Sequence, residues 1–310
     1  AIEMRLLFTI LFLTIVSSSY SQYRISSYLT KHRSSRHKNS LEKGAIFFSW
    51  GFNRSFYTDS RMKFSGKGHN FELSNIKAED NQSHRFSGNF YNPLDWTKTQ
   101  YNIKLGYYFK NKWSMTIALD HMKYQIIDNS GATLDGEVTF TTDEYISFND
   151  NLSFYHGDWY SKSVIIDKNY FNYNTNGGMN YLHLEWAKTA ELYNYNTKRP
   201  FVISSVTGFG TGIVLSNVNF TYNGTEHVKA RSLSGYGASL FTGVRIEFFR
   251  QMYLYANVSG GFLHQVNAKT IQSDQLSSAR HVFFYSQFDA GLGFFLFKRP
   301  KNGCDDCPVW

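Results

Sequence analysis

The alternation of apolar and polar positions is clearest near the end of the chain. From Val282 to Phe297, one set of alternate positions is mainly apolar, and the other set mixes aromatic, polar and glycine residues. A period of two predicts a β-strand. This strand is longer than the usual soluble strand of about 5–6 residues. Its apolar face would be about 25 Å tall, as a tilted membrane-spanning strand requires.

The same alternation recurs earlier in the chain, less regularly at 201–215, where Gly208, Gly210 and Gly212 share a face. A soluble β-sandwich also alternates, but these apolar faces are long and aromatic at their ends. We therefore predict an all-β protein, an antiparallel up-and-down transmembrane β-barrel over 44–297. Its eight predicted strands are 44–57, 100–110, 112–125, 179–191, 200–217, 231–249, 252–266 and 281–297. The strand-like stretch 69–78 predicts a hairpin above the membrane; if it entered the wall with a partner, the barrel would have ten strands.

Loop lengths predict the orientation, because outer-membrane barrels have short periplasmic turns and longer outer loops. The short connections at 110–112, 193–200 and 250–251 therefore mark the periplasmic side. Both termini are then periplasmic, including a tail over 298–310. The predicted extracellular loops are 58–99, 126–178, 218–230 and 267–280.

Composition narrows the class of protein further. The chain has 310 residues, of which 18% are aromatic, with 23 Gly, 4 Pro and a mean hydropathy of −0.39. These values exclude a multi-pass helical membrane protein and a collagen. Two cysteines, Cys304 and Cys307, exclude a disulfide-rich scaffold. They fit a small oxidised loop in the tail, whereas a zinc site would need two more ligands.

The N-terminus predicts export. Met4-Arg5 is followed by an apolar run over 6–16 and then by small polar residues up to Ser21, which is the pattern of a secretory signal peptide over 1–21. Residues 1–3 are interpreted as upstream translation. The segment 22–43 is basic and is predicted to be an exposed periplasmic segment. No nucleic-acid partner is predicted, because an exported protein rarely meets one.

The strand pattern, the turn asymmetry and the final aromatic segment GLGFFLF together resemble the small outer-membrane barrels of the OmpA/OmpX/OmpW type. The segment 101–124 (YNIKLGYYFKNKWSMTIALDHMKY) is similar to uncharacterised barrels of Bacteroidota. The resemblance implies the bacterial outer membrane as location, and outer-membrane lipid, lipopolysaccharide and the barrel-assembly machinery as partners. It supplies no catalytic residue. The 13 residues that follow Phe297 depart from the usual terminal placement of the assembly signal.

Charged residues on the inward faces predict a polar lumen. An eight-stranded barrel is only wide enough to be filled by side chains, so buried charges must be paired. Arg245 is expected to pair with Glu185, Glu247 or Asp289, and His183 beside Glu185 is either a satisfied interior histidine or a metal or proton site. A narrow pore is the alternative. The predicted lumen charge network is Lys104, Asp120, Glu185, Arg245, Glu247 and Asp289.

The loop 126–178 is the predicted recognition element. It holds eight acids against two lysines, and its mutual repulsion predicts a mobile loop. A divalent cation, a glycan or an extracellular protein could engage it, although its spacing matches no calcium loop. No metal site or cofactor is predicted. The residues predicted to carry recognition are Asp143, Glu144, Asp150, Tyr155, Asp158, Trp159 and Tyr160.

The sequence indicates no catalytic residues. His84 with Ser87 lies in a loop, and His121 is predicted to face lipid near the outer end of its strand. Neither forms a recognisable nucleophile–base pair. The sequence therefore predicts a non-enzymatic outer-membrane barrel with a filled polar lumen, acting through its loops in surface binding or envelope structure. A small-solute pore and a lipid-modifying enzyme are the alternatives.

Overall fold

The fold is that of a computed structural model, which describes residues 41–67, 69–80, 100–138, 157–175, 177–195, 201–222, 224–248 and 251–296. The described strands form one 15-stranded sheet. Within this part of the chain, no helix is long and apolar enough to cross a bilayer. The predicted signal peptide, residues 22–40, the tail with Cys304 and Cys307, and the pair His84 and Ser87 lie outside the described residues.

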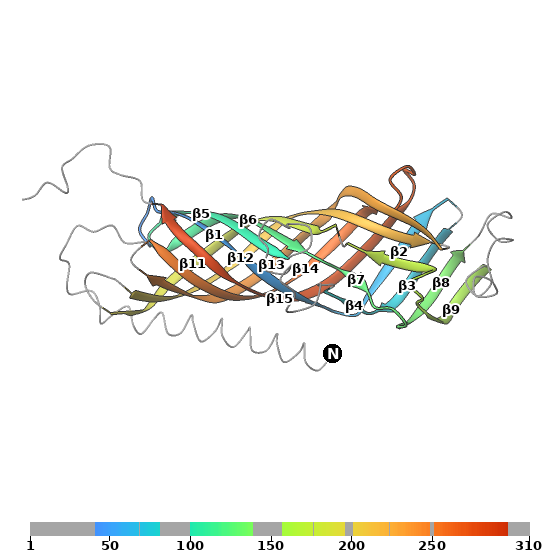
Figure 1. The fold of residues 1–310 in the computed structure, drawn as a ribbon, viewed down its shortest axis with the longest axis horizontal. Coiled ribbons are helices and arrows are strands. Elements are labelled where there is room, and N and C mark those ends of the chain that lie inside the picture. Colours follow the sequence, from blue (N-terminus) through green and yellow to red (C-terminus); the bar gives the residue numbers. More distant parts are fainter. Residues whose placement is uncertain are drawn as a thin grey trace, which may run out of the picture.

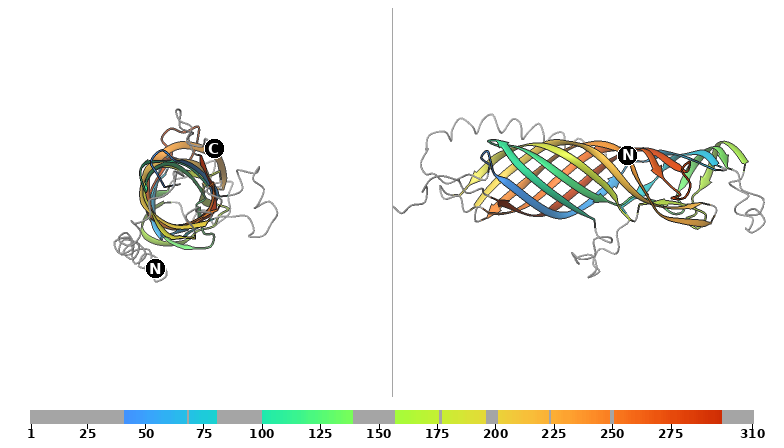
Figure 2. Two further views of the ribbon diagram at one scale, coloured as in Figure 1. Left: turned by 90° about the vertical axis from the view of Figure 1, so that its left-hand side faces the viewer. Right: turned by 90° about the horizontal axis from the view of Figure 1, so that it is seen from above.

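Eight long antiparallel strands close into a ring, which confirms the predicted up-and-down barrel (Figures 1 and 2). Each strand pairs with its neighbours in the ring, and the first closes on the last from Ile46 opposite Leu296 to Tyr57 opposite Tyr285. The ring consists of β1 (Ile46–Tyr57), β5 (Tyr101–Lys110), β6 (Trp113–Met122), β11 (Met179–Asn194), β12 (Phe201–Tyr222), β13 (Thr225–Phe248), β14 (Met252–Lys269) and β15 (Ser278–Leu296).

The other strands build a second region beyond one end of the ring, which we call the extension (Figure 1). Four of them continue the sheet outward from the start of β15, in the order β2 (Ser60–Gly66), β3 (His69–Ile76), β8 (Gly131–Val138) and β9 (Gly157–Ile165). Three short strands add to β12 in the order β10 (Phe171–Asn174), β7 (Gln125–Ile126) and β4 (Ala78–Glu79). The predicted hairpin at 69–78 is placed differently: this stretch supplies only β3, whose hairpin partner β2 lies in the predicted loop before it.

Several predicted outer loops were too long. The strands β12 and β13 continue to Tyr222 and start again at Thr225, so most of 218–230 is a hairpin rather than a loop. Likewise β14 runs to Lys269 and β15 begins at Ser278, which shortens the predicted loop 267–280. The segment 126–178 contains β8, β9 and β10 and is therefore largely sheet where it is described.

The two faces of the wall differ sharply. Inward positions are buried and mostly polar or aromatic, whereas outward positions carry a continuous band of exposed apolar residues, which we call the apolar belt. Exposed aromatic rings gather near the short turns, including Phe109, Trp113 and Tyr193. Every ring strand contributes to the belt, for example through Phe48, Leu105, Ile117, Leu184, Phe209, Leu240, Leu254 and Phe288.

Glycine makes room for large inward rings at one point of the wall. Gly51 of β1 lies directly opposite Gly291 of β15. The hydroxyl of Tyr255 occupies the space that a Cβ at either position would need. These glycines therefore allow a tyrosine to cross the lumen against the backbone, as dense packing of a narrow barrel requires.

The end of the ring with the short turns is covered by the first described residues. Lys112 N donates to the carbonyl of Leu41 at 2.8 Å, and Gly44 N donates to Tyr108 O at 2.8 Å. Leu41 is buried against Phe47 and Tyr108. The chain thus crosses the mouth of the barrel before it enters β1.

Candidate functional site

The lumen holds all six charged residues that the sequence predicted to face inward, each less than 10% exposed. Lys104 Nζ is the cation at their centre, 2.9 Å from Glu185 Oε1 and 4.0 Å from Asp289 Oδ2. Asn257 Nδ2 donates to Asp289 at 2.8 Å. A buried lysine paired with two acids, one of which also accepts from an amide, satisfies the requirement that interior charges be paired.

A second part of the network surrounds Asp120. His183 Nε2 lies 3.3 Å from Asp120 Oδ2, and His183 Nδ1 lies 3.9 Å from Glu185 Oε1. Gln287 Nε2 also donates to Asp120 Oδ2 at 3.3 Å, and Gln287 Oε1 accepts from Ser55 Oγ at 3.1 Å. His183 is therefore enclosed between two acids. Among the residues described, no cluster of three or more His, Cys, Asp or Glu side chains is placed to hold a metal ion.

Arg245 occupies an aromatic cage nearer the short turns. Its guanidinium carbon lies 4.5 Å from the ring centre of Tyr253, 5.0 Å from Phe47 and 5.5 Å from Phe295. Its Nη1 donates to Tyr108 Oη at 2.9 Å, and that hydroxyl lies 2.9 Å from Thr189 Oγ1. Desolvated contacts between arginine and aromatic faces contribute about 2 kcal/mol or more.

The predicted pairing of Arg245 with Glu185 or Asp289 is wrong. Glu185 and Asp289 were predicted partners of Arg245, but they belong to Lys104 instead. The reason is geometric, because Arg245 lies beside the rings of Tyr253 and Phe295 while Lys104 lies beside the acids. The sequence analysis did not predict the cage. Phe47 and Tyr108 occupy inward-facing alternate positions on their strands, and this pattern could have indicated it.

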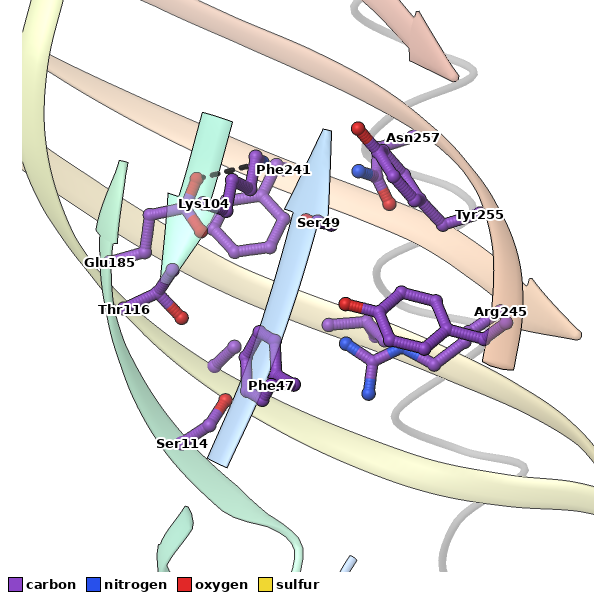
Figure 3. Close-up of a pocket in the computed structure, with 13 residues that line it drawn as sticks. Phe47, Ser49, Lys104, Ser114, Thr116, Glu185, Phe241, Arg245, Tyr255 and Asn257 are labelled. Atoms are coloured by element: carbon purple, nitrogen blue, oxygen red, sulfur yellow. Dashed lines mark hydrogen bonds and ion pairs between the residues drawn. The ribbon is translucent and has the colours of Figure 1, made fainter. Parts of the chain in front are cut away.

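A small cavity of about 30 Å³ separates the two groups of charges. Figure 3 shows Lys104 and Glu185 meeting on one side of it, with Arg245 and Tyr255 on the other. Hydroxyl groups of Ser49, Ser114 and Thr116 complete its polar lining. A volume of this size is enough for a water molecule with several polar partners.

Between the ion network and the extension, apolar side chains fill the lumen. Tyr181, Leu263, Phe283 and Tyr285 fill the upper ring and are each at most 1% exposed. They continue into the rings of the extension, where Phe64 stacks on Phe220 with centroids 5.5 Å apart. One continuous cluster of buried apolar side chains therefore closes the barrel and supports the extension.

His281 is a buried polar residue within this core. Tyr124 Oη lies 3.3 Å from His281 Nε2, and Ser60 Oγ lies 2.8 Å from the same nitrogen. His281 was not singled out by the sequence, since its partners Tyr124 and Ser60 come from two distant segments of the chain.

The residues predicted to carry recognition are only partly described. Asp143, Glu144, Asp150 and Tyr155 lie outside the described residues. The other three are on β9, where Tyr160 is 93% exposed and Trp159 packs partly against the core. Lys162 Nζ lies 3.1 Å above the Trp159 ring centre.

Three of the described acids of the segment 126–178 make local contacts, whereas Glu137 and Asp158 are register partners on β8 and β9. Asp135 accepts from Ser161 N at 2.6 Å, and Asp167 accepts from Asn169 N at 2.9 Å. Asp128 pairs with Lys168 at 3.3 Å. Each of these three holds a local turn or strand contact, so these acids stabilise the extension itself.

His121 does not face lipid openly as predicted. It is on the outward side of β6 but is only 4% exposed, because Tyr101 stacks on it with centroids 4.8 Å apart. Its Nδ1 lies 2.7 Å from Asn180 Oδ1, and Gly178 packs against its ring. His121 is therefore a buried packing residue at the border of the apolar belt.

Comparison with known proteins yields structural matches only. No family model and no curated protein matches the sequence. Solved structures of small outer-membrane β-barrels are similar to the chain. Outer membrane protein OprG from Pseudomonas aeruginosa has a TM-score of 0.40 and 9% identity, over 84% of this chain and 100% of that one.

Two further outer-membrane barrels are also similar to the chain, with lower TM-scores. Outer membrane protein AlkL has a TM-score of 0.35 and 12% identity, over 88% of this chain and 100% of its own. Ail, the attachment invasion locus protein of Yersinia pestis, has a TM-score of 0.28 and 9% identity, over 82% and 99%. Since these TM-scores are below 0.5, the barrel assignment rests on the strand pairings of this chain. The resemblance to Bacteroidota barrels stays a prediction.

Proposed function

We propose that the chain is an outer-membrane β-barrel with a filled lumen, which acts through its extracellular extension in surface binding or envelope structure. The observation that carries this proposal is the apolar belt. Large exposed apolar side chains occur on all eight ring strands, while the inward positions hold the charges. A protein in water would have the reverse arrangement, and a barrel in lipid has this one.

The lengths of the connections at the two ends of the barrel support the proposed orientation. The short turns at Asn111–Lys112 and near Gln251 face the periplasm, as the sequence predicts, and the extension then faces the outside. Aromatic residues beside the short turns, such as Trp113 and Tyr193, fit the girdle of the periplasmic interface.

Three successive groups of side chains occupy the lumen along the barrel, and they support the proposal that it is filled. The aromatic cage around Arg245 closes the periplasmic end together with Leu41. The ion network of Lys104 crosses the middle, and the apolar cluster with Phe283 and Tyr285 closes the top. The cavity between them, about 30 Å³, is too small for a solute.

The extension supports a role at the surface. It is a packed β-structure that shares its core with the barrel, so it is rigidly attached rather than a set of independent loops. Rigid scaffolds that present exposed side chains, such as Tyr160 on β9, suit binding because little conformational entropy is lost.

Planar-bilayer recording tests the filled lumen. The full chain, refolded and inserted from detergent, is expected to give no steps of single-channel conductance in 1 M KCl. The matched variant Phe283→Ala removes one ring of the apolar closure and leaves the ion network in place. Regular open-channel steps from the unaltered protein would contradict the proposal and favour the small-solute pore. Altered lipid A in the mass spectra of cells that express the protein would favour the lipid-modifying enzyme.

A further inference from the structure

Cationic side chains collect on one side of the barrel where the apolar belt ends. Arg280 precedes the exposed Val282 of β15 by two residues, and Arg231 precedes the exposed Leu233 of β13 by two residues. Lys269 of β14 lies between these strands, opposite Ser278. We call the set the outer cationic patch, which consists of Arg61, Lys63, Arg231, Lys269 and Arg280.

Two of these cations face each other directly. Lys63 of β2 is the register partner of Arg280 on β15, and both side chains are exposed. Like charges directly opposite in a sheet are destabilising. The placement of Lys63 and Arg280 opposite each other, beside the exposed apolar Val282, therefore destabilises this part of the sheet. A bound anion would remove that destabilisation.

The acids of the same row lie farther from the barrel wall than the cations, and Asp274, in the connection between β14 and β15, accepts from Leu276 N. Glu72, on the other side of Lys63, forms an ion pair with Arg61 at 3.1 Å between Nε and Oε1. Asp135, one strand further from the wall, accepts from Ser161 N. The row across the sheet is therefore positive next to the barrel wall and negative away from it.

The opposite side of the barrel lacks this charge at the same border. The outward residues there are Tyr101 on β5, His121 on β6, Asn180 on β11 and Asn217 on β12. None of these four is a lysine or an arginine. On β1, Arg54 is a further cation, and its guanidinium lies 3.6 Å from Asp80. The outer cationic patch is therefore confined to the side formed by β13, β14, β15 and β2.

We infer that the outer cationic patch binds the phosphate groups of phosphorylated glycolipid in the outer leaflet. This rests on the proposed function, since it requires the belt to be in the outer membrane. Two observations select a lipid: the charge is complementary to phosphate, and the patch is continuous with the apolar belt at Val282 and Leu233, where acyl chains would lie. Arginine forks match phosphate geometry in two hydrogen bonds.

The test uses the full chain folded in dodecyl maltoside micelles, titrated with bisphosphorylated lipid A and with lipid A whose phosphates have been removed. A cation near an anionic lipid surface contributes about 1 kcal/mol. The double variant Lys63→Gln with Arg280→Gln should therefore bind phosphorylated lipid A roughly 30-fold more weakly. The matched control, Lys110→Gln with Lys112→Gln at the opposite end, should bind it as the unaltered protein does.

Three results would overturn the inference: equal affinity of the double variant, equal affinity for dephosphorylated lipid A, or displacement by inorganic phosphate at constant ionic strength. If the double variant does not fold, Lys63→Gln alone should still weaken binding about fivefold. It should also stabilise the protein slightly in lipid-free micelles, because it removes the like-charge pair. Failure of the unaltered chain to form a heat-modifiable barrel in micelles would instead count against the proposed function.

Discussion

Replacing Lys104 with methionine removes the central cation of the lumen while keeping most of its volume. Lys104 Nζ lies 2.9 Å from Glu185 and 4.0 Å from Asp289, and all three side chains are at most 10% exposed. The variant leaves two buried acids close together without their cation. Removing one partner of a buried ion pair costs about 3–5 kcal/mol, so we expect the free energy of unfolding to fall by about that amount.

The assay is urea unfolding of the barrel in lipid vesicles, followed by gel mobility and extrapolated linearly to zero urea. Lys110→Met is the matched control, because Lys110 is exposed at a short turn and should change stability by no more than about 0.5 kcal/mol. Adding Glu185→Gln to Lys104→Met should recover part of the loss, since one unpaired acid is neutralised. A loss below about 1 kcal/mol that also shrinks with salt would refute the reasoning, because it would describe a hydrated, screened lumen.

A further prediction concerns the wall. Gly51→Ala meets the Tyr255 hydroxyl and the backbone of β15 and should cost about 1–3 kcal/mol. Gly131→Ala, which meets no atom within 4 Å, is its control; equal stability of the two variants in urea would contradict the packing argument.

The wall was predictable because its side chains alternate over long stretches. The predicted strands at 100–110 and 252–266 agree with β5 and β14 within a few residues. The start of β13 was missed, because its first residues, from Thr225 to Lys229, are exposed or half-buried on both sides and Lys229 has a positive φ. Without a buried face there is no alternation to detect.

The extension was underpredicted for a related reason. In β8 and β9 the register shifts between Leu134 and Gly136, and Gly136 and Ser161 have φ angles of 111° and 49°. These bulges interrupt the period of two, so the segment read as an acidic loop. The alternation of inward and outward positions was enough to predict which charged residues face inward. Their pairing depends on the tilt and stagger of the strands, which place Arg245 among rings from three other strands.

The most direct test of the central claim is cysteine labelling on intact bacteria that express the protein, in a background carrying Cys304→Ser and Cys307→Ser. Tyr160→Cys lies on the exposed side of β9 in the extension, and Lys110→Cys lies beside a short turn at the other end of the barrel. A membrane-impermeant maleimide should label the variant at position 160 on intact cells and the variant at position 110 only after the outer membrane is opened. Labelling of position 110 alone on intact cells would reverse the orientation, and recovery of both variants outside the outer-membrane fraction would contradict the account altogether.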